Sequence, residues 1–248
     1  IGGTLTESFN TFCENDISGV FNAYFQYSAV INSNIFRNAV TVDTGGAGGG
    51  ETAVPRKTFS GNVIKPGFAV NLSSAVVSDL YVESGGAGTV GIGYCDVSAS
   101  RISTNSSITF NGCRVSSCFL AASGGTFITA QGTCAFSSTT FVNQLNAGDF
   151  TTIDGCDLRS TLSWVGNLST YRLHVTNSLV NVYVGYVGSN SGSSFFSNST
   201  VKGITVGQYS RAYFENCHIS TSAGWTTDGD DLTFSICYLD LTSVRMIA

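Results

Sequence analysis

The chain has 248 residues, of which only 11% are charged, and it contains 29 glycines but two prolines. High glycine without proline excludes collagen and argues against a disordered Pro/Gly tract. The formal net charge of −5, with only three lysines, leaves no basic surface for a nucleic-acid partner. No apolar run approaches the roughly 20 residues that cross a bilayer, so no membrane insertion is expected.

Residues 1–50 are predicted to form an irregular N-terminal segment or the first coils of the repeat described below. The chain begins at Ile1 without Met or a signal pattern, which indicates a processed product or an excised fragment. A glycine-rich cluster at 44–50 predicts a flexible loop or boundary, and residues 51–248 are predicted to be regular. The GxGxxG match at 86–91 runs into another repeat rather than a helix, so no dinucleotide or other cofactor is expected.

A short pattern recurs along the regular part of the chain: an apolar residue, two variable residues, a small residue, one variable residue and a second apolar residue. Good copies begin at positions 92, 110, 136, 153, 175, 196, 214 and 234, and weaker ones at 35, 59 and 72. The mean step is (234 − 92)/7, or about 20 residues. A repeat of this length indicates a stacked architecture in which each unit buries its face against the next.

The interior of the pattern predicts a bend between two strands. The first apolar residue and the small residue lie three apart, so both point inward only if the chain turns between them. Five copies carry Gly or Asn just before the small residue, and these residues tolerate the left-handed conformation. They are Gly112, Gly155, Asn177, Asn198 and Asn216. The three asparagines fall in consecutive copies, which predicts a hydrogen-bonded ladder.

Cysteine fills the small position in five copies, at Cys95, Cys113, Cys156, Cys217 and Cys237. The eight cysteines show no metal-ligand spacing beyond the lone Cys113 to Cys118 pair, and no metal site is predicted. Small buried thiols fit the pattern best, with disulfides as the alternative. Unpaired thiols indicate synthesis in a reducing cytosol.

Tandem units of this kind resemble the coils of a single-stranded right-handed parallel β-helix, as in the pectate-lyase-like superfamily and bacteriophage tailspikes. The resemblance covers residues 59–241 in good register and 12–58 in poor register. It implies an all-β fold with about 20-residue coils, almost no helix apart from a short cap, and a homotrimer. Inward positions need apolar residues and stacked outward columns favour Ser, Thr and Asn over like charges, which explains the low charge. The positive mean hydropathy fits a further burial surface between chains.

Carboxylates are the natural catalysts if the ligand is a polysaccharide, because glycoside cleavage uses an acid and a base or nucleophile roughly 5 to 9.5 Å apart. One pair flanks a bend, a third acid occupies the equivalent position three coils later beside His218, and three more crowd one loop, where a cation could also bind. The alternative is solvated surface acids and turn-forming aspartates. The candidates are Asp154 and Asp157, then Glu215, then Asp228, Asp230 and Asp231.

Three aromatic residues stand 11 positions after the start of their copies, namely Trp164, Tyr186 and Trp225. If their loops align, the rings form a glycan-stacking platform on one face of the β-helix. The alternatives are an aromatic stack within the coils and a trimer seam.

Three functions are compatible with these features. The preferred one is a phage tail spike or fibre module, made in the host cytoplasm and located in the virion, that binds a bacterial surface polysaccharide with or without cleaving it. A secreted pectate-lyase-like lyase or hydrolase is the second. The resemblance would then imply a Ca²⁺-binding cluster of aspartates beside an Arg or Lys that acts as the base. In this chain the arginines are scattered, and no acidic cluster lies in adjacent coils. A structural shaft or adhesin without a small ligand is the third.

Overall fold

In a computed structural model, the chain is an all-β parallel solenoid with coils of about 20 residues. The structure describes residues 10–24, 29–43, 57–65, 67–83, 88–123, 126–148, 150–159, 162–164, 172–180, 184–185, 193–202, 205–206, 211–220, 226–227 and 232–240. These residues contain strands and turns but no helix, and accordingly none of them belongs to a helix that could cross a membrane. The predicted all-β parallel solenoid with coils of about 20 residues is therefore confirmed.

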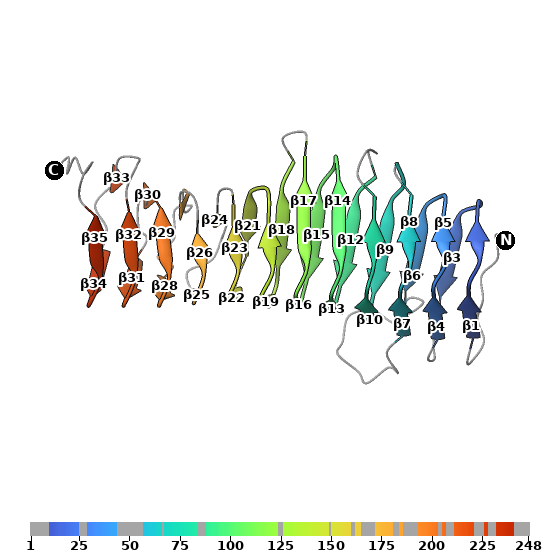
Figure 1. The fold of residues 1–248 in the computed structure, drawn as a ribbon, viewed down its shortest axis with the longest axis horizontal. Helices are drawn as coiled ribbons and strands as arrows, with labels where there is room; N and C mark the ends of the chain where they lie inside the picture. Colours follow the sequence, from blue (N-terminus) through green and yellow to red (C-terminus); the bar gives the residue numbers. More distant parts are fainter. Residues whose placement is uncertain are drawn as a thin grey trace. The chain divides into compact units, whose positions relative to one another are not determined.

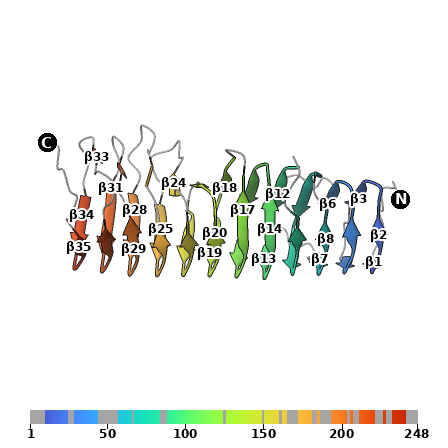
Figure 2. The same ribbon diagram turned by 45° about the horizontal axis from the view of Figure 1, so that its top comes forward.

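The described residues belong to two compact units, Ile1–Thr126 (unit 1) and Phe127–Ala248 (unit 2). Within each unit the chain passes in turn through three parallel sheets, which we call A, B and C. Strands of one sheet lie side by side within each unit, as Figure 1 shows. The turned view of Figure 2 separates the sheet C strands β3, β6 and β12 of unit 1 from those of the other two sheets.

The described residues of unit 1 supply six strands to sheet A, six to sheet B and five to sheet C. Its sheet A consists of β1 (Asn10–Cys13), β4 (Ala29–Asn32), β7 (Lys57–Ser60), β10 (Ala75–Ser78), β13 (Asp96–Ser98) and β16 (Arg114–Ser116). Its sheet B consists of β2 (Asp16–Ile17), β5 (Ile35–Phe36), β8 (Val63–Ile64), β11 (Tyr81–Val82), β14 (Arg101–Thr104) and β17 (Phe119–Ala122). Its sheet C consists of β3 (Phe21–Tyr24), β6 (Val40–Asp43), β9 (Val70–Ser73), β12 (Val90–Gly93) and β15 (Ile108–Asn111).

Unit 2 repeats this arrangement. Its sheet A consists of β19 (Ala135–Ser137), β22 (Thr152–Asp154), β25 (Arg172–Thr176), β28 (Ser193–Ser197), β31 (Arg211–Glu215) and β34 (Leu232–Ser235). Its sheet B consists of β20 (Thr140–Phe141), β23 (Asp157–Leu158), β26 (Leu179–Val180), β29 (Thr200–Lys202), β32 (His218–Ser220) and β35 (Tyr238–Asp240). Its sheet C consists of β18 (Ile128–Gln131), β21 (Leu145–Ala147), β24 (Leu162–Trp164) and β27 (Val184–Gly185), and β30 (Thr205–Val206) pairs with β33 (Thr226–Thr227).

The strand alternation builds a continuous apolar column inside each unit. In unit 1, Val97 pairs with Val77 and with Val115, and all three side chains are buried. In unit 2, Phe196 stacks on Phe214 with ring centroids 4.8 Å apart. In-register parallel pairing places like residues one strand spacing apart, so each coil buries its inward residues against those of its neighbours.

The predicted left-handed bend is confirmed, and it occurs at every coil between sheet A and sheet B. The residues with positive φ at this first corner are Glu14, Ser33, Gly61, Asp79, Ala99, Ser117, Ser138, Gly155, Asn177, Asn198, Asn216 and Ile236. A second corner, between sheet C and sheet A, has Ser74, Tyr94, Gly112, Gly132 and Phe150 at positive φ. At Gly112 a Cβ atom would lie 2.9 Å from the ring of Tyr94, so this position also requires glycine for space.

The predicted copies of the repeat do not all lie at the same corner of the coil. The copies that begin at 92 and 110 span the second corner, whereas those from 136 onward span the first, so the long step between 110 and 136 marks a change of corner. Measured at the first corner alone, the mean step is (236 − 14)/11, or about 20 residues. The weak copy at 35 matches neither corner, because that coil bends at Ser33 instead.

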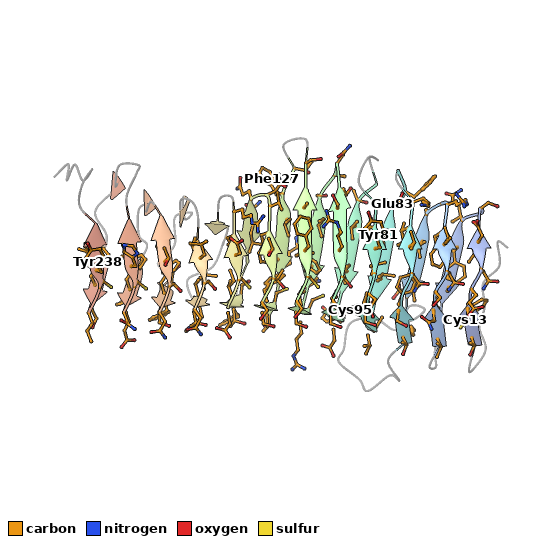
Figure 3. All side chains as sticks on the ribbon, viewed as in Figure 1. Cys13, Tyr81, Glu83, Cys95, Phe127 and Tyr238 are labelled. Atoms are coloured by element: carbon orange, nitrogen blue, oxygen red, sulfur yellow. The ribbon has the colours of Figure 1, made fainter. Side chains whose placement is uncertain are left out.

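The buried thiols are confirmed for six of the eight cysteines. None of the eight described cysteines forms a disulfide, and Cys95, Cys113, Cys118, Cys134, Cys156 and Cys217 are buried. Their Sγ atoms donate to backbone carbonyls, as from Cys113 to Ile92 at 3.2 Å. Cys95, labelled in Figure 3, occupies the interior position of the second corner. Burial raises the pKa of Cys156 to about 11, which suits an unreactive thiol that fills space.

The outer surface carries the predicted hydroxyl columns. On sheet A of unit 1, Ser60, Ser78, Ser98 and Ser116 pair in register on successive strands. The predicted asparagine ladder is only partly correct. Asn216 donates to the side-chain oxygen of Asn198 at 2.8 Å, but Asn177 donates to Asp154 instead.

Candidate functional face

Two outward columns cover sheet A of unit 2, and we call them together the ladder face. Strand register aligns one column through Thr152, His174, Phe195, Tyr213 and Thr233. It aligns the second through Asp154, Thr176, Ser197, Glu215 and Ser235. The columns stand two residues apart along each strand, so both project from the same side of the sheet.

The centre of the first column is an aromatic ladder. The ring of Phe195 stacks on His174 and on Tyr213, with centroids 5.0 Å apart in both pairs and interplanar angles of 17° and 10°. This distance follows from the spacing of parallel strands. Because the rings cover one another's faces, the ladder presents ring edges along its length and open faces only at its two ends.

Sequence reasoning missed these three rings, although a signal was present. His174, Phe195 and Tyr213 each stand directly before the first apolar residue of three consecutive copies. In a strand, the residue next to an inward one points outward, so an aromatic at this place in three neighbouring copies predicts an external stack.

Asp154 is an ionised hydrogen-bond acceptor on the ladder face. Its Oδ1 accepts from the hydroxyl of Thr176 at 2.7 Å and from the amide of Asn177 at 2.8 Å. These hydrogen bonds lower the pKa of Asp154, because they stabilise the carboxylate over the acid. A general acid needs the opposite shift, so Asp154 is suited to accept hydrogen bonds from a ligand rather than to donate a proton.

Asp157 lies across the Gly155 bend from Asp154, on β23 of sheet B rather than on the ladder face. Its Oδ2 accepts from Arg159 Nε at 2.8 Å. Its Oδ1 is buried without a hydrogen-bond partner among the residues that the structure describes. The two predicted acids therefore project from different sheets and have different partners.

Glu215 and His218 occupy the positions of Asp154 and Asp157 three coils along, as predicted. Three strand spacings separate Asp154 from Glu215 by about 14 Å, beyond the roughly 5 to 9.5 Å that a glycosidase pair uses. These two acids thus do not form one catalytic dyad.

The remaining candidates fall largely outside the described residues. Asp228, Asp230, Asp231, Tyr186 and Trp225 all lie there. Only the backbone of Trp164 is described. This residue ends β24 and pairs in register with Ala147 of β21. The predicted carboxylate loop and the predicted aromatic platform therefore stay predictions.

No group of three or more potential metal ligands occurs in the part of the chain that the structure describes. The two columns of the ladder face offer hydrogen-bonding groups and aromatic ring edges. Such groups can recognise a polar ligand that also has apolar patches.

Replacing Asn177 with glycine is expected to raise the pKa of Asp154 toward its ordinary value of 3.8. Glycine keeps the left-handed bend, for which Asn177 has φ of 50°, and removes only the amide donor. The carboxyl ¹³C chemical shift of Asp154 during a pH titration measures the change. Asn198→Gly is the matched control, since Asn198 has φ of 48° and donates to neither oxygen of Asp154, and an equal shift in both variants would contradict the assignment.

Comparisons with known proteins identify no relative. No protein-family model matches the chain, and no curated protein and no solved structure matches it significantly.

Proposed function

We propose that this protein is a module of a bacteriophage tail spike or tail fibre, displayed on the virion, that binds a bacterial surface polysaccharide along the ladder face. The observation that carries the proposal is the parallel course of an aromatic column and a column of carboxylate and hydroxyl groups. The resemblance of the coils to tailspike β-helices supports the phage assignment, and it is an argument from fold alone.

The chemistry of the face suits a carbohydrate. A sugar presents C–H surfaces that pack on aromatic groups, together with hydroxyls that need hydrogen-bond partners. On the ladder face the edge of Phe195 supplies apolar contact, while Asp154 and Glu215 supply charged acceptors in the adjacent column. The repeat of both columns along the strands fits an extended, repeating ligand better than a compact one.

Binding is the activity proposed, and cleavage is a separate question. Asp154 and Glu215 lie too far apart to act together, and hydrogen bonding lowers the pKa of Asp154. Depolymerisation by a hydrolase or lyase mechanism would then depend on acids elsewhere, of which the 228–231 loop is the candidate.

The test is a binding assay with purified surface polysaccharides from a panel of bacteria, in which chain length is measured after incubation. Phe195→Thr is expected to weaken binding at least about tenfold, equivalent to about 1.4 kcal/mol. Threonine preserves an outward residue of the kind present at Thr152 and Thr233.

The control is Val76→Thr, which changes an outward apolar residue of sheet A in unit 1 to the same amino acid. This variant should bind like the wild type. Absence of binding to every polysaccharide, or equal binding by both variants, would overturn the proposal for the ladder face.

A structural shaft is the second candidate, and a specific observation favours it. The serine column of unit 1 has no charge and no aromatic group, so it lets the coils stack without like-charge repulsion and offers a ligand only neutral hydroxyls. If the polysaccharide panel shows no binding, this function replaces the first.

We further propose that the module assembles as a homotrimer. On sheet B of unit 1, an outward column contains Ile35, Val63, Tyr81 and Phe119, with the Arg101 guanidinium 4.2 Å from the Phe119 ring centroid. Tyr81, labelled in Figure 3, is 42% exposed, and a column that is mostly apolar between the charged residues Asp16 and Arg101 supports association between chains. Mass measurement in solution tests the assembly, and a monomer would contradict it.

A further inference from the structure

Two cysteines lie at the first corner of neighbouring coils in unit 2. Cys217 follows the bend at Asn216, and Cys237 follows the bend at Ile236 in the next coil. The residues after them, His218 and Tyr238, are paired in register, so the two cysteines occupy matching positions on neighbouring coils. The Sγ of Cys237 donates to the backbone carbonyl of Phe214 in the neighbouring coil at 3.4 Å, so its side chain reaches toward the coil that holds Cys217. Adjacent parallel strands lie about 4.8 Å apart, within the Cα separation of about 4.4 to 6.8 Å that a disulfide spans.

The two thiols differ in access. Cys217 is buried, whereas Cys237 is only partly buried and stands between two highly exposed residues. Ile236 is 83% exposed and Tyr238, which begins β35 and is labelled in Figure 3, is 68% exposed. Strands β34 and β35 are the terminal strands of sheets A and B in unit 2, so no further described strand covers Cys237 on that side.

We propose that Cys217 and Cys237 are a redox-active dithiol that forms a reversible disulfide by exchange with a small-molecule disulfide such as oxidised glutathione. Cys237 loses its proton and its thiolate attacks one sulfur of the reagent, which breaks the reagent's S–S bond and releases one glutathione. Cys217 then loses its proton and attacks Cys237 Sγ, releasing the second glutathione. Two protein thiols are oxidised, and one oxidised glutathione is reduced to two thiols.

The order of attack follows from the surroundings. Burial raises the pKa of the Cys217 thiol, so the thiolate needed for the first attack forms less readily there. Once Cys237 carries the mixed disulfide, the neighbouring position of Cys217 makes the second attack intramolecular. The product links the last described coil of unit 2 to the coil before it.

The chain contains an internal comparison pair. Cys95 and Cys113 also occupy matching positions on neighbouring coils, because Asp96 and Arg114 pair in register. Both are buried, with exposed fractions of 1% and 0%, and each thiol donates to a backbone carbonyl. Equal spacing with no solvent access predicts that this pair does not react in the folded protein.

The test is to incubate the native protein with oxidised glutathione, alkylate the remaining thiols after denaturation, and identify linked peptides by mass spectrometry. A Cys217–Cys237 link that dithiothreitol removes is expected, with Cys95 and Cys113 alkylated. Failure to detect that link, or formation of a Cys95–Cys113 link at the same rate, would overturn the proposal.

Two serine variants test the order of attack. Cys217→Ser should leave Cys237 as a lasting glutathione adduct, whereas Cys237→Ser should leave Cys217 unmodified. Serine already fills this corner position at Ser178 and Ser199, so both variants are expected to fold, and the wild-type measurement decides the proposal if either does not. A glutathione adduct on Cys217 in the Cys237→Ser variant would contradict the proposed order.

Discussion

Asn62→Ala is expected to lower the free energy of unfolding by about 3–5 kcal/mol, because it leaves several buried polar groups without partners. Asn62 and Asn34 are both fully buried at the first corner of unit 1. The Asn62 Oδ1 accepts from the backbone N–H of Asn34 at 2.9 Å and from its side-chain amide at 3.1 Å. The Asn62 amide donates to Ile31 O at 2.9 Å. Alanine removes all three hydrogen bonds, and water cannot replace them in the interior.

The control is Asn62→Ser, because serine occupies the same corner position in other coils. Ser100 accepts there from the backbone N–H of Leu80 at 3.1 Å. Serine at position 62 can therefore keep the bond from Asn34 N–H while it loses the other two, and its loss of stability should be clearly smaller than that of Asn62→Ala. Chemical denaturation followed by far-ultraviolet circular dichroism measures both variants. Equal losses would show that the hydrogen bond from the Asn34 backbone N–H to residue 62 does not determine stability here.

Lys57→Met is expected to raise the free energy of unfolding at neutral pH by about 1–4 kcal/mol, because it removes an unpaired charge from the interior. Lys57 is fully buried, and its Nζ has no hydrogen-bond partner among the described residues. In register it pairs with Ala75, and on the other side Ala29 stands directly before Val30, the partner of Thr58, so both neighbouring positions carry small side chains. Methionine fills similar space without a charge.

The effect should depend on pH with a definite sign. Burial lowers the pKa of Lys57 below 10.5, and the charge of Asp43 opposes this only in part. Between the lowered pKa of the folded state and the ordinary pKa of the unfolded chain, the unfolded state binds more protons. The stability of the wild type therefore rises with pH through that window. The advantage of Lys57→Met should shrink as pH approaches 10.5.

Lys65→Met is the matched control for the buried lysine. Lys65 is partly exposed and forms an ion pair with Glu83, so its replacement should change the free energy of unfolding by less than about 1 kcal/mol. Denaturation at several pH values distinguishes the two lysines. A loss of stability in Lys57→Met at every pH would mean that the ammonium group is paired in the folded protein.

The coil was predictable because its demands on each residue are local. Each coil repeats an inward apolar residue, a left-handed bend and a small buried residue. Residues such as Gly155 and Asn216 indicate the bend, because Gly and Asn tolerate positive φ. The bends at Tyr94 and Ile236 could not be predicted from residue type, since neither favours positive φ. Packing of the flanking strands imposes the bend on them.

The candidate face was harder to predict, because it depends on which residues meet across coils. The equivalence of Asp154 and Glu215 follows from counting within the repeat. The partner of Asp154 does not, since Asn177 donates to it rather than to the next asparagine in the column. A side chain on the face has possible partners at similar distances on neighbouring coils, and its rotamer decides which partner it contacts. The repeat pattern in the sequence does not reveal that rotamer.

The sequence by itself determined the all-β solenoid, the coil length, the buried thiols and the neutral outer columns, because these depend on periodicity and residue size. Only the tertiary structure decided that two different corners share one pattern, that His174, Phe195 and Tyr213 stack, and that Lys57 and the Asn34–Asn62 pair lie in the interior. Register between coils sets these contacts. Insertions of varying length hide that register in the linear chain, whereas parallel strand pairing fixes it in the fold.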